Sequence, residues 1–316
     1  MQPLACKTSI VTSPILNCND DLTKTAWTAL IPVLFVFLWS TGFIGAKYGL
    51  PYAEPFTFLF VRMALTSALL LLAIIFLKKS WPSSWRLSGH VAVSGILVHC
   101  GYLGGIFSAI ALGMPSGLAA LIAGLQPLLT AFAAYPLLGE RVTSKQWTGL
   151  VLGLIGIGLV LSEKISGQTD SLFSGFGWDA IVFALIAVFG ITASSLYQKK
   201  YCTAMPMISG TFIQYGAATL VYGALAIALE TMKIQWTTEF ILALTWLIFA
   251  LSIGAISLLM LMIRQGEASK VASLFYLVPP VTAVEAYFLF DERLGLAALI
   301  GLGVTSIGVA LAVRSK

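Results

Sequence analysis

The chain has few charged residues. Only 10% of its 316 residues are Asp, Glu, Lys or Arg, whereas 59% are hydrophobic and the mean hydropathy is +0.95. Soluble domains carry about 25% charged residues, so a water-soluble globular fold is excluded. The cysteines lack the CxxC or Cys/His spacing that predicts a metal site or a disulfide framework, and they are Cys6, Cys18, Cys100 and Cys202.

Motifs for nucleotide or metal chemistry are also missing. The sequence contains no GxxxxGK[ST] phosphate loop and no HExxH zinc motif. Its two histidines, His90 and His99, have no metal-ligand spacing. A channel filter such as TVGYG is not visible either. We therefore expect no cofactor, no bound metal and no enzymatic activity.

Long apolar runs recur along almost the whole chain. A bilayer core of roughly 30 Å requires about 20 apolar residues in a helix. The sequence therefore predicts an all-α integral membrane protein with ten transmembrane helices, over residues 28–49, 55–77, 88–111, 116–138, 144–163, 177–198, 209–229, 240–263, 269–290 and 293–313. Residues 1–26 hold no apolar run long enough for a signal peptide, and we expect them to form a cytoplasmic tail.

The net charge of +5 follows the predicted topology. With the N-terminus inside, the outer side holds only Lys164, Lys233 and Arg293. The other basic residues outside the helices gather on the inner side, namely Lys7, Lys24, Lys78, Lys79, Arg86, Arg141, Lys145, Lys199, Lys200, Arg264, Lys270, Arg314 and Lys316. This is the positive-inside distribution. It predicts that both termini are cytoplasmic, and it makes the lipid bilayer rather than a nucleic acid the expected partner.

The sequence contains an internal repeat. Residues 115–163 align without gaps with residues 267–315, and the matched pairs include Pro127 with Pro279, Thr130 with Thr282, Tyr135 with Tyr287, and Glu140-Arg141 with Glu292-Arg293. A fainter match in the earlier helices pairs Trp27 with Trp178 and Pro55 with Pro206. We infer a first five-helix repeat over 27–163, a connecting loop over 164–176 and a second repeat over 177–316. Because five is odd, the second repeat must be inverted in the membrane, an arrangement typical of secondary transporters.

Several segments of the sequence resemble one transporter family. They are WSTGFIGAKYGLPYAEPFTFLFVR from Trp39, HCGYLGGIFSAIALGMPSGLAALIAGLQPLLTA from His99, SLYQKKY from Ser195 and SLFYLVPPVTA from Ser273. Together they resemble the EamA family of the drug/metabolite transporter superfamily over about residues 28–313. The resemblance implies a ten-helix carrier of the bacterial inner membrane that exports amino acids or related metabolites without ATP hydrolysis. A nucleotide-sugar or other phosphorylated-metabolite carrier of the same superfamily remains the alternative.

Six residues are candidates for binding a small-molecule substrate because they place polar or aromatic groups near the middle of predicted helices. They are Trp39, Phe43, His99, Tyr102, Gln126 and Tyr276. An imidazole at position 99 has the chemistry to bind a substrate carboxylate or to exchange a proton. The alternative is a neutral histidine that bonds a backbone carbonyl. The aromatic residues either stack on the substrate or only pack between helices.

Three charged residues fall inside predicted helices, toward their outer ends. A charge at the bilayer centre costs about 2.5 to 3.5 kcal/mol on insertion scales, so each requires a reason. Lys47, Arg62 and Glu285 predict an outer gate that is closed by ion pairing, with protonation of Glu285 coupling transport to a proton. The alternative is a permanent structural salt bridge.

Five further residues have structural interpretations. Pro127, Pro279 and Pro280 are expected to kink helices and free backbone carbonyls, or simply to shape helix packing. Glu140 and Glu292 each precede a predicted helix, and we expect each to cap that helix. The sequence does not predict the oligomeric state, the direction of transport or the substrate itself.

Overall fold

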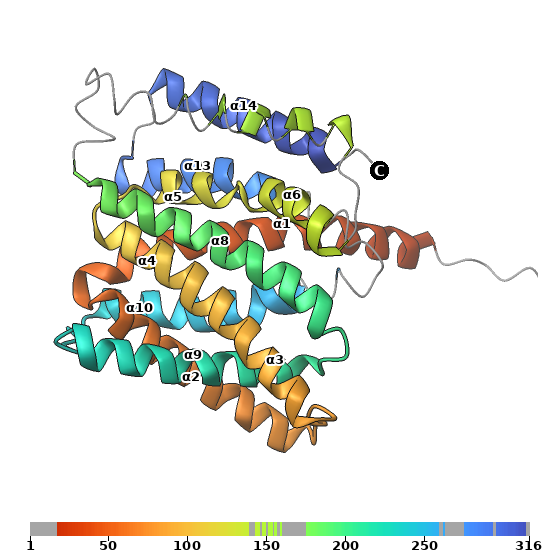
Figure 1. Ribbon diagram of the computed structural model, residues 1–316, viewed down its shortest axis with the longest axis vertical. Coiled ribbons are helices and arrows are strands. Elements are labelled where there is room, and N and C mark those ends of the chain that lie inside the picture. The colour runs from red at the N-terminus through yellow and green to blue at the C-terminus, as the bar shows by residue number, and fades with distance from the viewer. Residues whose placement is uncertain are drawn as a thin grey trace, which may run out of the picture.

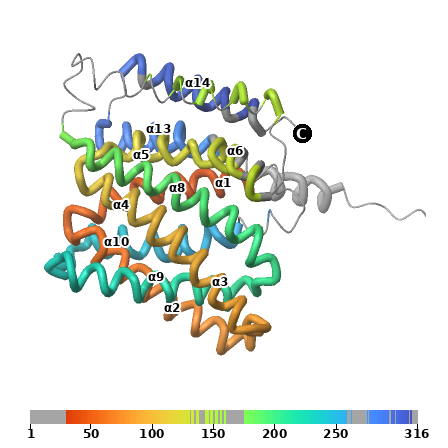
Figure 2. Tube along the Cα trace, viewed as in Figure 1, coloured from red at the N-terminus to blue at the C-terminus, as the bar shows by residue number. Residues whose placement is uncertain are grey.

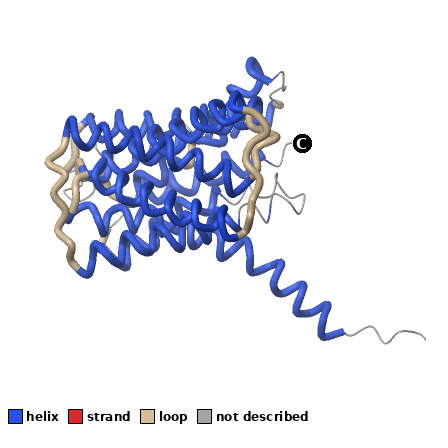
Figure 3. The backbone as a smooth tube through the Cα atoms, turned by 90° about the horizontal axis from the view of Figure 1, so that it is seen from below, coloured by secondary structure: helices blue, strands red, loops and turns tan. Residues whose placement is uncertain are grey.

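In the computed structural model, the secondary-structure elements of the described residues are all helices, joined by turns and loops. The described residues are 18–138, 175–258, 275–292 and 295–313, together with Met262 and short helical stretches between 143 and 159. The helices lie roughly parallel to one another in stacked layers (Figures 1 and 2), and the connecting loops gather at the two ends of the bundle (Figure 3).

The first half of the chain forms helices in this order: α1 (Cys18–Gly49), the short η1 (Leu50–Tyr52), α2 (Pro55–Phe76), α3 (Trp85–Gly95), the π-helical η2 (Ile96–Leu103), α4 (Gly104–Ala111), α5 (Ser116–Ala123) and α6 (Gln126–Leu138). The predicted helix 88–111 is thus one long rod with a π-helical middle. The predicted helix 116–138 is interrupted at Gly124 and Leu125, directly before Gln126-Pro127. Proline at 127 has no backbone N–H to continue the helical ladder.

The second half forms α8 (Trp178–Tyr201), α9 (Met207–Leu229), α10 (Thr238–Trp246), the π-helical η3 (Leu247–Ala255), the short η4 (Phe275–Leu277), α13 (Val278–Phe290) and α14 (Leu296–Val313). Pro279 and Pro280 lie in the first turn of α13, directly after the short η4. Proline is well tolerated there because the first amides of a helix have no intrahelical acceptor.

The lengths and composition of these helices fit a membrane protein. Among the described residues, six helices are long and apolar enough to span a bilayer: Leu30–Tyr52, Pro55–Phe76, Trp85–Ala111, Trp178–Tyr201, Met207–Leu229 and Thr238–Leu258. Shorter apolar helices cover Ser116–Thr130, Val278–Phe290 and Leu299–Gly308. Large apolar side chains point outward, for example Phe76, Leu220 and Phe288 with exposed fractions of 79%, 77% and 78%. Such a surface is suited to lipid rather than water.

Contacts between α2 and α9 define the two ends of the bundle. Glu230, after α9, accepts hydrogen bonds from the backbone amides of Phe56 and Thr57 at the start of α2, at 2.8 and 2.7 Å. Ser209, near the start of α9, donates to the carbonyl of Ser80 after α2, at 2.7 Å. The two helices therefore run antiparallel. We call the end that carries 50–54 and 230–237 the η1 end, and the end that carries 77–84 the α2–α3 end.

Glycines allow close contacts between helices that are distant in the sequence. A Cβ on Gly190 of α8 would lie 2.8 Å from backbone atoms of Gly101 and Tyr102, and a Cβ on Gly105 would lie 2.5 Å from the carbonyl oxygen of Phe183. Real Cβ atoms do not approach backbone so closely. Position 190, where α8 crosses the η2–α4 rod, must therefore be glycine, as in other close contacts between membrane helices through small residues.

Candidate substrate cavity

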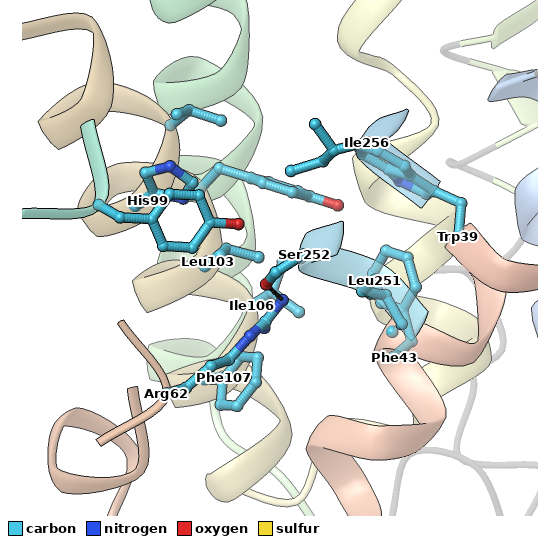
Figure 4. A pocket seen from close by; sticks show the side chains of 14 residues that line it. Trp39, Phe43, Arg62, His99, Leu103, Ile106, Phe107, Leu251, Ser252 and Ile256 are labelled. Carbon is cyan, nitrogen blue, oxygen red and sulfur yellow. Dashed lines mark hydrogen bonds between the residues drawn. The ribbon is translucent and has the colours of Figure 1, made fainter. Parts of the chain in front are cut away.

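A cavity of about 100 Å³ lies inside the bundle (Figure 4). Its walls come from α1, α2, the η2–α4 rod, α9 and η3. The lining is mostly aromatic and aliphatic, with a few polar groups. The residues are Trp39, Gly42, Phe43, Arg62, Val98, His99, Tyr102, Leu103, Ile106, Phe107, Tyr215, Leu251, Ser252 and Ile256. An apolar hollow with few polar groups is the usual form of a small-molecule site.

Both π-helical segments face this cavity. His99 and Tyr102 come from η2, and Leu251 and Ser252 come from η3. A π-helix widens the backbone ladder by one residue and is frequent at functional sites. In the register that pairs Trp27 with Trp178, Ile96 at the start of η2 corresponds to Leu247 at the start of η3. The two irregular segments thus occupy equivalent positions in the two halves of the sequence.

Arg62 lies in the wall of the cavity, and the ion pair predicted for it is absent among the described residues. Its side chain is 3% exposed, and its guanidinium reaches toward Ser252 (Figure 4). The Nη2 to Ser252 Oγ distance is 3.4 Å, which is long for a hydrogen bond, and Nε has no partner. Among the described residues, no carboxylate forms an ion pair with Arg62.

His99 and Tyr102 lie one above the other along η2, both on the cavity side. Neither ring nitrogen of His99 has a hydrogen-bond partner in the structure, although the residue is only 6% exposed. Its ring packs against that of Tyr215, with centroids 4.2 Å apart, and its backbone carbonyl accepts a bond of 2.6 Å from the Tyr222 hydroxyl. The imidazole itself therefore does not bond a backbone carbonyl.

Trp39, Phe43 and Tyr102 also line a second, smaller cavity of about 20 Å³ that adjoins the first. Gln126 and Pro127 belong to this second cavity, where the Gln126 amide donates to Ser195 Oγ at 3.2 Å. The structure thus brings five of the six predicted substrate-binding residues around two neighbouring hollows that share lining residues. The side chain of the sixth, Tyr276, lies outside the described residues.

A layer of phenylalanines separates the cavity from the η1 end. Phe58 contacts Phe107 and Phe240, with ring centroids 5.4 and 5.0 Å apart, and all three are at most 1% exposed. On α2, Phe58 lies one turn nearer the η1 end than Arg62. Phe107 and Phe240 are likewise nearer that end than the polar cavity residues of their own rods. In this conformation the cavity is covered on the η1 side.

The ion pair at the η1 end has different members from those predicted. Lys47 pairs with Glu292, and neither Lys47 nor Arg62 pairs with Glu285 among the described residues. Glu292 also accepts hydrogen bonds from the backbone amides of Ser116 and Gly117, at 3.1 and 3.3 Å. It therefore caps α5 in the other half of the chain, whereas the sequence predicted that it caps the helix that follows it. Glu140 lies outside the described residues.

Only one of the two carboxylate oxygens of Glu285 has a hydrogen-bond partner. Ser40 Oγ of α1 donates to Glu285 Oε1 at 2.7 Å, while Oε2 is buried without a hydrogen-bond partner. A carboxylate normally accepts several hydrogen bonds, so this side chain is poorly satisfied as an anion. The arrangement joins α1 to α13 at a point that is not part of the cavity lining.

Two polar residues of the cavity, Tyr215 and Ser252, are absent from the sequence-based candidates. Both lie in the second half, within helices that are otherwise apolar. The sequence feature that could have identified them is a hydroxyl group inside a membrane helix, where burying a polar group costs free energy. Serine and tyrosine occur throughout this chain, so composition alone does not separate these two from packing residues.

Comparison with known proteins finds the same family twice along the chain. The EamA-like transporter family matches residues 26–162 and again residues 178–314. The chain belongs to this family. Within it, the cavity draws Trp39 to Phe107 from the first match and Tyr215 to Ile256 from the second. The EamA domain is thus duplicated, and the protein is a membrane transporter of the drug/metabolite transporter type.

Individual relatives of this EamA protein are distant but align over most of their length. It is 25% identical over 283 residues to the "Probable amino-acid metabolite efflux pump" of Escherichia coli (strain K12), covering 84% of this chain and 87% of that one. It is 26% identical over 279 residues to the "Uncharacterized inner membrane transporter YedA" of the same strain, covering 88% of each. A solved crystal structure with 21% identity superimposes with a TM-score of 0.61 over 90% of this chain and 95% of the other, which shows a common fold.

Proposed function

We propose that this protein is a secondary transporter of the bacterial inner membrane that exports small organic metabolites, such as amino acids or related compounds, by alternating access. The observation that carries the proposal is the central cavity, which is lined by both EamA matches and covered at the η1 end. A site between two related halves is what alternating access requires. The name of the Escherichia coli relative, an amino-acid metabolite efflux pump, supports the substrate class and the direction.

We further propose ten transmembrane helices arranged as two inverted halves, 27–163 and 177–316. Reciprocal glycine contacts support this arrangement. A Cβ on Gly156 would lie 2.6 Å from the carbonyl oxygen of Gly301, and a Cβ on Gly308 would lie 2.7 Å from that of Gly149. In the sequence repeat, Gly149 corresponds to Gly301 and Gly156 to Gly308. Exchanging the two halves therefore turns one contact into the other, which is what a two-fold axis between the halves requires.

Charge supports placing the η1 end outside the cell and both termini inside. The described basic residues near the α2–α3 end are Lys78, Lys79, Arg86, Lys199 and Lys200. Acidic residues predominate near the η1 end, namely Glu54, Asp179, Glu230, Glu239, Asp291 and Glu292. Basic loops remain in the cytoplasm in most membrane proteins. In this orientation the structure represents an outward-closed conformation.

Glu285 is the group that we propose for coupling to protons. Its carboxyl joins α1 to α13 through Ser40, so a change of protonation alters a contact between the two halves. The Lys47–Glu292 pair, which also links α1 to the end of α13, is the proposed outer latch.

Reconstituted vesicles test the proposal directly. Purified protein in lipid vesicles is expected to exchange radiolabelled amino acids across the membrane and to accumulate them when a pH gradient is imposed. Nucleotide sugars provide the comparison, because a carrier for phosphorylated metabolites is the alternative that the buried cation Arg62 favours. Uptake of nucleotide sugars without uptake of amino acids would replace the first proposal by the second. Vesicles that transport neither would contradict both.

A further inference from the structure

The buried guanidinium of Arg62 has no adequate partner in the protein. Arginine carries five N–H donors, and here the structure provides one long contact, to Ser252. An unpaired charge inside a protein is expensive unless an anion accompanies it. Arg62 also lines the cavity and points into it (Figure 4). The missing partner is therefore expected to come from whatever occupies the cavity.

The described lining of the cavity carries one fixed charge. Arg62 is its only Arg or Lys, and no Asp or Glu is among the described residues that line it. A bound cation would meet Arg62 without a counter-ion. A bound monoanion would instead neutralise the site, and a carboxylate matches the fork of the guanidinium with two parallel hydrogen bonds.

The rest of the cavity is suited to an apolar or aromatic body. Trp39 and Phe43 lie across the cavity from His99, and Leu251 and Ile256 extend the apolar wall (Figure 4). His99, whose ring nitrogens have no partner, adds one neutral donor or acceptor for a second polar group.

We propose that the cavity recognises a monocarboxylate with an apolar body, whose carboxylate is held by Arg62. The inference rests on the proposed transport function and narrows its substrate class. An amino group on the substrate is not required for binding, since the described lining offers no acid to pair with it. Arg62 is accordingly a substrate-binding residue that decides between anions and cations.

Ligand-dependent heat stability of the purified full-length protein tests this assignment, because a ligand that binds only the folded state raises its melting temperature. The probes are 3-phenylpropionate, phenylalanine, phenylalaninamide, phenethylamine and phenyl phosphate at equal concentration. We expect the two carboxylates to stabilise the wild type, with 3-phenylpropionate at least as effective as phenylalanine. The amide and the amine are expected to have no effect.

Variants of Arg62 provide the second part of the ligand-stabilisation experiment. Arg62→Gln is expected to weaken carboxylate binding roughly tenfold or more, whereas Arg62→Lys retains the charge and part of the affinity. Arg86→Gln is the matched control, because Arg86 is an exposed arginine of α3 outside the cavity. The wild-type comparison of carboxylate with amide requires no variant, so misfolding of Arg62→Gln does not block the test.

Several results would overturn the carboxylate assignment. They are equal stabilisation by phenethylamine and 3-phenylpropionate, stronger stabilisation by phenyl phosphate than by 3-phenylpropionate, and undiminished carboxylate binding in a folded Arg62→Gln protein. A failure of both carboxylates to stabilise the wild type would also overturn the assignment. Transport of an uncharged or cationic solute by vesicles of the same preparation would leave the proposed function intact while rejecting the anion site.

Discussion

Lys47, in the last turn of α1, forms an ion pair with Glu292, the second residue after α13. The pair is partly shielded, since the side chains are 32% and 9% exposed. It fastens the η1 ends of α1 and α13 together on the side where the phenylalanine layer covers the cavity. If the η1 end is the extracellular gate, this pair holds it shut.

We predict that Lys47→Gln opens the cavity to the outside. Losing about 1 kcal/mol from the closed state would raise the open fraction roughly fivefold. The measurement is the rate at which a membrane-impermeant maleimide labels a cysteine at Leu251, a cavity residue, in a protein whose four native cysteines are replaced. A neutral replacement is preferable to exchanging the two charges of the pair. The exchange would put a cation at position 292, where it would face the positive end of α5.

Glu230→Gln is the control for this labelling experiment. Glu230 also caps a helix at the η1 end, but it joins α2 to α9 and not α1 to α13. Both variants are expected to lower the melting temperature, and only Lys47→Gln is expected to speed labelling. Equal labelling rates in the wild type and Lys47→Gln would reduce the ion pair to a structural contact.

Glu285→Gln is expected to uncouple transport from the pH gradient. Glutamine keeps the size and the bond from Ser40 but neither gains nor loses a proton at ordinary pH. Accumulation driven by a pH gradient should fall to the level of protein-free vesicles, while exchange of labelled for unlabelled substrate should continue. Glu239→Gln, in the first turn of α10, is the control and should retain both. Normal pH-driven accumulation in Glu285→Gln would make Glu285 part of the scaffold.

Gly190→Ala is predicted to destabilise the protein, because its Cβ would meet the backbone of Gly101 and Tyr102 at 2.8 Å. Backbone cannot move aside as a flexible side chain can, and overpacking of this kind costs about 1–3 kcal/mol. The melting temperature in detergent should therefore fall by several degrees. Gly89→Ala on α3 meets nothing within 4 Å and should leave stability unchanged or slightly increased. Equal melting temperatures for the two variants would argue against close packing of α8 on the η2–α4 rod.

The sequence predicted the broad architecture because bilayer thickness imposes helix length, and apolar runs of that length are visible without a structure. Trp39, Phe43 and Tyr102, which the sequence predicted near the middle of the bilayer, lie around the cavity because depth along a helix can be counted. The π-helical form of η2 and η3 was not predictable, because nothing in ILVHCGYL or LIFALSIGA breaks an α-helix.

The charged residues were harder to place. Counting along the predicted helices placed Arg62, Lys47 and Glu285 at similar depths, which suggested mutual pairing. Depth along a helix leaves rotation about its axis undetermined, and rotation decides the partner. Arg62 faces the cavity, Glu285 faces Ser40, and Lys47 reaches Glu292 across 245 residues of sequence. Such long-range partners depend on the tertiary packing of helices, which the periodicity of one helix does not contain.

The inverted arrangement of two halves is the central claim, and the loops that follow α2 and α9 test it most directly. They occupy equivalent positions in the two halves, and Ser83 and Lys233 are exposed on them. Cysteines at 83 and 233 would be introduced singly into protein without its native cysteines. In spheroplasts, an impermeant maleimide should label position 233 at once and position 83 only after the membrane is permeabilised. Labelling of both positions from the same side would contradict the inverted repeat.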